Sequence, residues 1–104
     1  MSDKLQIKDQ ALNGSDFKSV SLKNSQFQDV DMVDTKIVDT NMTGLTFENV
    51  NLTDATFDDV NLSGASINAA NLTGLEITNA DLTDAMIDGI LITDLIAAYE
   101  ASQL

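Results

Sequence analysis

The chain has 104 residues, enough for one domain with a core that can support itself. It carries five Lys or Arg against seventeen Asp or Glu, for a net charge of -12 at pH 7, which excludes direct binding to nucleic acid because phosphate contacts need a basic surface. Cys and His are absent, which excludes disulfides, thiolate or imidazole metal sites and His-activated nucleophiles, so no cofactor is expected.

Residues 1–9 form the first predicted segment, an N-terminal cap or a partial coil. The stretch from Met1 to Gln6 lacks the apolar core of a secretory signal, so we expect a cytoplasmic protein. Leu5 and Ile7 keep the inward register described below, whereas Gln10 does not. Elsewhere, the longest apolar stretch covers residues 90–98 and is too short to cross a bilayer, so no membrane partner is expected.

A large apolar residue returns at every fifth position through residues 10–92. These positions, called centres, are Leu12, Phe17, Leu22, Phe27, Met32, Ile37, Met42, Phe47, Leu52, Phe57, Leu62, Ile67, Leu72, Ile77, Leu82, Ile87 and Ile92. On an α-helix, steps of five would spread around the axis, and on a flat strand they would alternate between faces. A chain that turns a corner every five residues points all of them inward, so the period predicts a solenoid.

Turn-forming residues recur two positions after each centre. This column holds all five glycines, for example Gly14 and Gly74, and most of its other members are Asn or Asp. Only Ser19 and Ala69 depart from these types. Gly, Asn and Asp tolerate positive φ or bond their own backbone in turns, so the column predicts a corner at every repeat. A small apolar residue usually stands two positions before the centre and is also predicted to face inward.

The types of the centres predict how many sides make one coil. A coil of twenty residues stacks like on like, with Leu12, Met32, Leu52 and Leu72 in one column and Phe27, Phe47, Ile67 and Ile87 in another. A coil of fifteen would stack Leu on Phe, and a two-sided coil of ten would leave little room for the Phe rings. We therefore predict four sides and about four coils, a rod roughly 20 Å tall at about 4.8 Å per layer.

Two stretches carry a family resemblance. Ala70-Asn71-Leu72-Thr73-Gly74 and Ala80-Asp81-Leu82-Thr83-Asp84 resemble the pentapeptide-repeat signature of Ala, then Asp or Asn, then Leu, then two variable residues. The resemblance covers about residues 10–92 and implies an all-β fold, the right-handed quadrilateral parallel β-helix of that family. The early repeats depart most from the signature. The residues that stand where Ala is usual are Ser15, Ser25, Thr35 and Thr40.

The period ends in residues 93–104, which are predicted to form a short α-helix. Thr93 or Asp94 is the candidate N-cap, and Leu95, Ile96 and Tyr99 share one helical face. Such a short helix is marginal alone in water, so its apolar face needs a cover. Two alternatives are open. The face caps its own last coil, or it joins two copies in a two-fold homodimer, which the resemblance supports because family members often dimerise through C-terminal helices.

Three recurring patterns have weaker functional interpretations. Triplets such as Asn51-Leu52-Thr53 match the glycosylation sequon but are simpler to interpret as by-products of the repeat. Stacked acids such as Asp34 and Asp54 are favoured turn residues, so no calcium site is expected. Thr columns alternate with Asn or Asp and form no wide ice-binding plane. Acids and hydroxyls on a convex surface form no catalytic pocket, so neither a catalytic residue nor a metal site is expected.

The charges after Lys36 are all acidic and indicate a basic protein partner. Family members that confer quinolone resistance resemble B-form DNA in width and charge and bind the DNA-holding surface of type II topoisomerases. The resemblance therefore implies DNA gyrase or topoisomerase IV as the partner. The candidate phosphate surrogates are Asp54, Asp58, Asp59, Glu76, Asp81, Asp84 and Asp88. The alternative is a scaffold module for another protein, in which the acids serve turns and solubility. Competition by linear DNA and a steep salt dependence separate the two.

Overall fold

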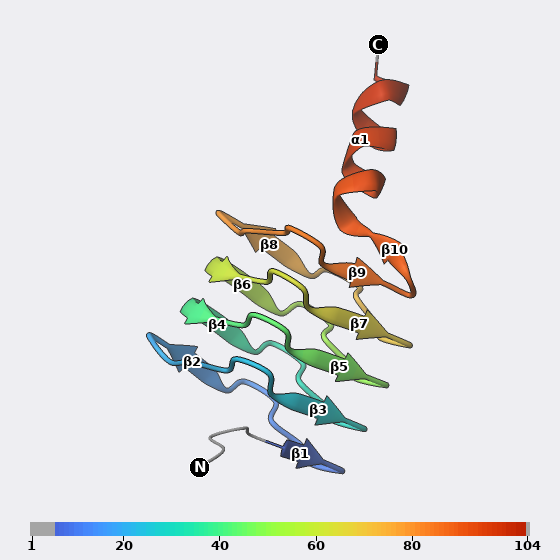
Figure 1. Ribbon diagram of the computed structural model, residues 1–104. Helices are drawn as coiled ribbons and strands as arrows, with labels where there is room; N and C mark the ends of the chain where they lie inside the picture. The colour runs from blue at the N-terminus through green and yellow to red at the C-terminus, as the bar shows by residue number, and fades with distance from the viewer. Residues whose placement is uncertain (1–5, 104) are drawn as a thin grey trace.

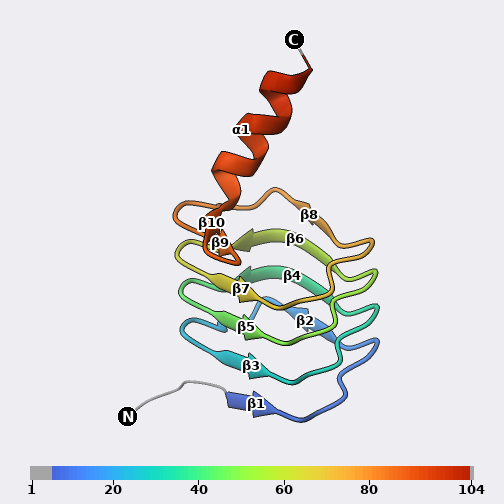
Figure 2. The same cartoon turned by 90° about the vertical axis from the view of Figure 1, so that its right-hand side faces the viewer.

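The protein is a right-handed parallel β-solenoid of about four coils followed by one α-helix, as a computed structural model of residues 6–103 shows (Figures 1 and 2). Leu5 and most of the predicted N-terminal cap lie outside these described residues. The strands are β1 (Gln6–Lys8), β2 (Asp16–Lys18), β3 (Gln26–Gln28), β4 (Lys36–Asn41), β5 (Thr46–Glu48), β6 (Thr56–Asn61), β7 (Ser66–Asn68), β8 (Glu76–Thr78), β9 (Met86–Ile87) and β10 (Ile90–Leu91). The helix is α1 (Ile92–Ser102).

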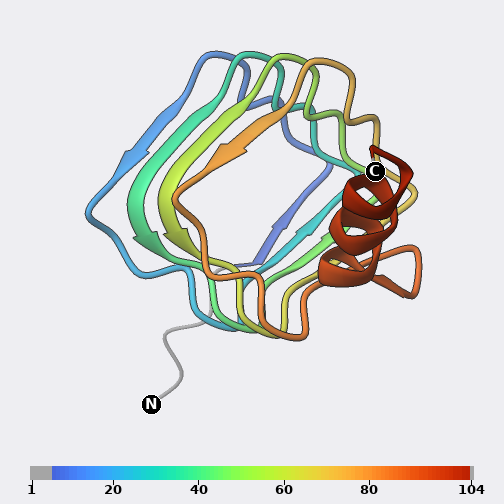
Figure 3. The same cartoon turned by 90° about the horizontal axis from the view of Figure 1, so that it is seen from above.

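The strand register confirms a coil of twenty residues with four sides (Figure 3). Side A is the sheet β1-β3-β5-β7-β9-β10, and side C is the sheet β2-β4-β6-β8. Side B, around Leu12, Met32, Leu52 and Leu72, and side D, around Leu22, Met42, Leu62 and Leu82, are held mainly by single bridges. Examples are Asp31 to Asn51 on side B and Asn61 to Asp81 on side D. Each layer therefore hydrogen-bonds to the next on every side.

The centres fill the interior as the period predicts. Those of the middle coils are buried, while Ile7, Leu12, Phe17, Leu72, Ile77, Leu82 and Ile87 in the end coils are half-buried. The Phe27 and Phe47 rings pack at a tilt of 46° with their centroids 5.3 Å apart, and Phe47 stacks on Phe57 at 6.1 Å. The departures from Ala are accommodated, since Thr35 is fully buried and its Oγ1 donates to the carbonyl oxygen of Leu12 at 3.1 Å. The core therefore runs as one column through the coils.

The predicted corner column adopts positive φ throughout. Gly14 has a φ of 73°, and the two exceptions in residue type follow the same conformation, Ser19 at 54° and Ala69 at 54°. Asp9 extends the column by one repeat, with a φ of 57°. The left-handed corner is thus a property of the coil that the chain meets with Gly, Asn or Asp where it can.

The C-terminal end differs from the prediction in three ways. The solenoid stops at Ile87, where Asp88 and Gly89 both have positive φ and turn the chain back into an antiparallel β9–β10 hairpin. This is the backbone of a type I′ turn, which favours Asp-Gly. The helix begins at Ile92, not Thr93, and the Ile92 N–H, which has no partner inside the helix, donates to the carbonyl oxygen of Ala85 at 3.0 Å. Its N-cap is Leu91, with no side-chain cap, so the expectation of Thr93 or Asp94 was wrong.

The helix also leaves the coil instead of lying across it. It stands over one edge of the last coil and packs mainly against β10 (Figures 1 and 3). Leu95 and Ile96 are each 43% exposed and Tyr99 is 65% exposed. The single chain therefore does not use this face as a cap for its own last coil. No helix within residues 6–103 is both long and apolar enough to cross a membrane.

Candidate protein-interaction surface

The coil distributes the predicted acidic residues over several sides. Asp58, Asp59 and Glu76 lie on side C, on β6 and β8. Asp81 belongs to side D, and Asp84 stands at the corner that follows side D. Asp54 stands at the corner between sides B and C, and Asp88 occupies the hairpin turn. All are exposed except Asp58, which is half-buried. The seven residues therefore do not form one face.

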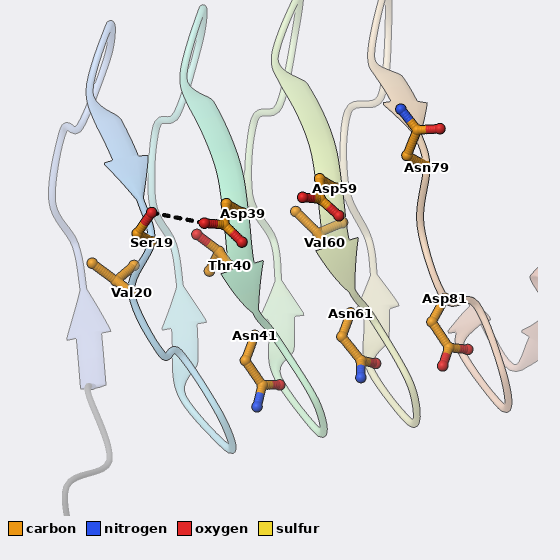
Figure 4. Close-up of a pocket in the computed structure, with 10 residues that line it drawn as sticks. All are labelled: Ser19, Val20, Asp39, Thr40, Asn41, Asp59, Val60, Asn61, Asn79 and Asp81. Carbon is orange, nitrogen blue, oxygen red and sulfur yellow. Dashed lines mark hydrogen bonds between the residues drawn. The ribbon is translucent and has the colours of Figure 1, made fainter.

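Part of the predicted set meets in a shallow groove where side C turns into side D (Figure 4). The groove has a volume of about 580 Å³. Its lining consists of Ser19, Val20, Asp39, Thr40, Asn41, Asp59, Val60, Asn61, Asn79 and Asp81. The predicted Asp59 and Asp81 are joined there by Asp39. The sequence places Asp39 one coil below Asp59, but the predicted set of phosphate surrogates does not include it. We call these lining residues the acidic groove.

Polar residues at intervals of twenty lie one above another along the acidic groove. Ser19, Asp39, Asp59 and Asn79 follow one another at the same corner, and the Ser19 hydroxyl donates to Asp39 Oδ2 at 2.8 Å. Successive layers of a β-sheet lie about 4.8 Å apart, so Asp39 and Asp59 present neighbouring carboxylates. The lining contains no Lys to neutralise them. This arrangement can accept hydrogen bonds from a row of cationic side chains, but it is too open to enclose a small substrate.

Asp58 has a different role because side chains of the next layer hold its carboxylate on the outer surface of the solenoid. Its Oδ1 accepts hydrogen bonds from Asn79 Nδ2 at 2.9 Å and from Thr78 Oγ1 at 2.8 Å. These bonds, the one from Asn79 first, lower the pKa of Asp58 below its ordinary value of 3.8. Asp58 therefore ties β6 to the layer that contains β8, and it is less free to contact a partner than Asp59.

The carboxylates of Asp81 and Asp88, by contrast, accept hydrogen bonds from backbone N–H groups. Asp81 Oδ1 accepts from the Thr83 N–H at 3.0 Å and from Thr83 Oγ1 at 2.7 Å, and the backbone bond is the main reason why the pKa of Asp81 is lowered. Asp88 Oδ1 accepts from the Ala69 N–H at 3.0 Å and ties the hairpin to the preceding coil. Asp81 lines the acidic groove, whereas Asp88 does not.

The bond made by Asp81 recurs at other repeats and explains the sequon-like triplets. The side-chain Oδ1 of Asn accepts from the N–H two residues later at Asn41, Asn51, Asn61 and Asn71. Where the third residue is Thr, as in Thr43, its hydroxyl often bonds the same oxygen. The triplet is therefore an Asx turn that stabilises the coil. Its repeated spacing was the sequence signal for this role.

The described surface was also searched for apolar patches and for clusters of metal-ligating side chains. The exposed face of α1, consisting of Leu95, Ile96 and Tyr99, is an apolar surface that no part of the described chain covers. Within residues 6–103, no three of the potential metal-ligating carboxylates converge on one point. We therefore take the acidic groove and the α1 face as the candidate surfaces for a partner.

Comparison with known proteins points to one family. The family profile described as a pentapeptide repeat region matches residues 8–77. A pentapeptide-repeat protein from the Arabidopsis thaliana thylakoid lumen aligns with 89% of this chain and 75% of its own, at 20% identity and a TM-score of 0.47. No curated protein gives a significant match.

Two further solved structures align over a smaller share of their own length. HetL from the cyanobacterium Nostoc, which is involved in heterocyst differentiation regulation, aligns at 19% identity and a TM-score of 0.37, over 81% of this chain and 47% of its own. QnrB1, a plasmid-mediated fluoroquinolone resistance protein, aligns at 16% identity and a TM-score of 0.39, over 81% of this chain and 51% of its own. This chain thus spans about half the length of both.

Proposed function

The chain belongs to the pentapeptide-repeat family, and from this premise we propose that it is a non-enzymatic binding module for a basic protein surface. The observation that carries the proposal is the acidic groove, in which Asp39, Asp59 and Asp81 lie on one open surface without a Lys. No Lys or Arg follows Lys36 anywhere in the chain. Like charges gathered on one surface steer and orient a partner of opposite charge.

The finer form of the proposal is a DNA mimic that binds DNA gyrase or topoisomerase IV. The molecule measures 46 × 28 × 23 Å, so it is a rod with a narrow cross-section. Its carboxylates repeat along the rod axis at the layer spacing of about 4.8 Å, which gives regularly placed negative charge as a DNA backbone does. A basic surface that holds DNA is therefore a suitable partner for the acidic groove.

The experiment titrates the protein into a gyrase supercoiling reaction, with and without a quinolone. We expect inhibition or protection from drug-induced cleavage. Binding should be lost when linear DNA is added and should weaken steeply between 50 and 200 mM salt, by roughly tenfold or more, because the contacts are ionic. A folded protein without effect at tens of micromolar would remove gyrase as the partner, and the same titration with topoisomerase IV would then decide the DNA-mimic proposal.

Matched variants test whether the acidic groove is the contact. The triple variant Asp39→Asn, Asp59→Asn, Asp81→Asn removes three charges inside it. The control Asp9→Asn, Asp29→Asn, Asp34→Asn removes three charges outside it, at corners where Asn is an equally good turn residue. We expect the groove variant to weaken binding by roughly tenfold or more and the control by less than about threefold. Equal losses would show that net charge alone matters.

A second candidate function is a scaffold that binds another protein through α1. The observation in its favour is the exposed α1 face, with Tyr99 as its most exposed member. We also propose that this face mediates self-association of the chain, which would lengthen the rod. Binding through α1 should be insensitive to added DNA and should fail in a Leu95→Gln, Tyr99→Gln variant. A complex that survives this variant and dissociates with DNA would exclude the scaffold function.

A further inference from the structure

The two sheets of the solenoid end differently at the last coil. The sheet of side A is closed by the antiparallel strand β10, against which α1 packs. The sheet of side C ends at β8, and no strand of residues 6–103 pairs with the edge of β8 that faces away from β6. The helix stands over another side of the coil and leaves β8 uncovered (Figure 3). We call this unpaired edge, residues 76–79, the open edge.

Backbone donors of the open edge have no acceptor in the chain. In the first coil the Ser19 N–H donates to a carbonyl oxygen of the layer above at 3.0 Å. Asn79 holds the same corner position in the last coil, but its N–H makes no backbone hydrogen bond within residues 6–103. The Glu76 N–H donates to the layer below at 3.0 Å. Because the N–H groups of successive strand residues point to opposite edges, the Ile77 N–H faces the open side.

The apolar interior of the last coil is open on the same side. Ile77 is half-buried, whereas Phe57, its partner in the layer below, is fully buried. The difference arises because a further layer covers Phe57 and no strand covers Ile77. Leu72 and Leu82, the centres on the flanking sides, are half-buried as well. An apolar side chain placed one layer above Ile77 would therefore remove apolar surface from water.

The charge around the open edge is of one sign. The acids within residues 71–88 are Glu76, Asp81, Asp84 and Asp88, and no base lies among them. Glu76 is exposed on β8 itself. Successive side chains of a strand point to opposite faces, so a strand that places an apolar residue above Ile77 places its neighbours on the outer face, next to Glu76. Basic residues at these outer positions would pair with the carboxylate.

A second copy of the chain fits the open edge poorly. Its own unpaired edge on side C is that of β2, and continuing the column of side C would place Asp16 of the second copy above Glu76. Like charges directly opposite each other on neighbouring strands are unfavourable. We propose instead that the open edge binds an extended segment of a partner protein in which apolar and basic residues alternate. The segment becomes an additional strand of the side C sheet.

The added strand makes three kinds of contact. Its carbonyl oxygens accept hydrogen bonds from the N–H groups of Ile77 and Asn79, one apolar side chain packs on Ile77, and its basic side chains face Glu76. Partner binding by the acidic groove is a separate matter, because Asp39 and Asp59 lie in the layers below the open edge. The two proposals therefore stand or fall independently.

The experiment uses a short synthetic peptide in which Lys and Val alternate. Its affinity is measured by isothermal titration calorimetry in 150 mM NaCl, and the exchange of each backbone N–H with water is measured by NMR. The control peptide has the same side chains, but every backbone nitrogen is methylated, so it keeps its charge and cannot pair as a strand. In the protein, Glu76→Lys reverses the charge at the open edge. Its matched control is Asp16→Lys, an exposed acid in the same column at the other end.

Strand addition makes specific backbone groups less accessible to water. Saturating peptide should slow the exchange of the Ile77 and Asn79 N–H groups by roughly tenfold or more. The Thr56 N–H, which already donates to the layer below at 2.9 Å, should not change. The methylated peptide should bind roughly tenfold more weakly because it lacks the strand pairing. Glu76→Lys should weaken binding by roughly fivefold, and Asp16→Lys by less than about twofold.

Four outcomes would overturn the proposal. The first is a peptide that binds without slowing exchange at Ile77 and Asn79, because it would then be held by charge alone. The second is equal affinity of the methylated and unmethylated peptides, and the third is the absence of measurable binding at 1 mM peptide. The fourth is slow exchange of the same N–H groups in the concentrated protein without peptide, which would make a second copy the occupant of the open edge.

Discussion

At the scale of single residues, the corners carry most of the conformational strain. Each corner residue has a φ near 50–80°, which an L-amino acid other than Gly adopts at a cost of about 1 kcal/mol or more. Asn and Asp offset part of this cost because their short side chains bond locally. Ala69 has a Cβ atom and no polar side chain that could bond locally, yet its φ is 54°. It is therefore the corner at which a substitution should help most.

We predict that Ala69→Gly raises the free energy of unfolding by about 1 kcal/mol, since Gly removes the left-handed strain. The measurement is urea denaturation followed by circular dichroism. The matched control is Ala65→Gly, at a buried position without positive φ, which should lower stability by roughly 1 kcal/mol. A destabilised Ala69→Gly variant would show that the methyl group is worth more than the strain.

Asp81 makes stability depend on pH. The bonds from Thr83 lower its pKa in the folded chain below the ordinary value of 3.8. A lowered folded-state pKa stabilises the fold above the unfolded pKa, and this contribution is lost as the pH falls through the folded pKa. Asn at this position keeps the turn, as Asn71 does, but cannot titrate.

We therefore predict that the free energy of unfolding of the wild type, relative to that of Asp81→Asn, is higher at pH 6 than at pH 3. Urea midpoints at the two pH values give the comparison, and the difference cancels the general relief of charge repulsion at low pH. The gap should shrink in a Thr83→Ala background, which removes one of the two donors. A gap that is the same at both pH values would contradict the lowered pKa.

At the scale of elements, the middle coils depend on the Phe stack more than the end coils do. Phe47 is fully buried between Phe27 and Phe57, whereas Phe17 is half-buried in the first coil, 6.4 Å from Phe27. Solenoid coils contact only their neighbours, so an end coil can open by itself. We predict a loss of about 3–5 kcal/mol for Phe47→Ala and a clearly smaller loss for Phe17→Ala. Urea denaturation with hydrogen exchange by coil measures both, and equal losses would mean that the solenoid unfolds as one unit.

The C-terminal helix should contribute little to the stability of the solenoid. Only Ile92 is buried in α1, and a chain that ends at Thr93 keeps this contact. All the residues it loses within the described range, 94–103, are exposed. At 5 µM we expect its free energy of unfolding to lie within about 0.5 kcal/mol of the full chain. Ile92→Ala, by contrast, should cost about 2 kcal/mol. A loss of several kcal/mol on truncation would show that the helix caps the last coil after all.

These elements differ in how far the sequence predicts them. The centres and corners follow from the period of five because every layer repeats the same geometry, down to the departures Ser19 and Ala69. The hairpin was missed although Asp88-Gly89 is a strong type I′ signal, because the register ran on through Ile92. The direction of α1 cannot be predicted from the period of five, because it depends on the direction in which the β9–β10 hairpin leaves the last coil. The acidic residues were chosen by their density in the sequence, and only the coil shows which of them share a side.

At the scale of the whole molecule, charge opposes compactness. A net charge of -12 is confined to a rod of 46 × 28 × 23 Å. The Debye length is roughly 30 Å at 10 mM salt and roughly 10 Å at 0.1 M. At low salt, repulsion therefore acts across most of the rod, while at higher salt only neighbours such as Asp39 and Asp59 still interact. Like charges that repel in the compact state and separate on unfolding destabilise the fold.

The last prediction follows from this repulsion. Raising NaCl from 10 mM to 0.3 M should increase the free energy of unfolding by on the order of 1 kcal/mol, which is about the strength of one close pair of like charges in water. Urea denaturation at 5 µM measures the change, and a constant denaturant slope ensures that the midpoint reports stability. The variant Asp39→Asn, Asp59→Asn has two fewer charges, so it should be more stable at low salt and gain less from NaCl. A midpoint that falls with salt, or one that shifts equally in both chains, would mean that the stacked carboxylates cost the fold nothing.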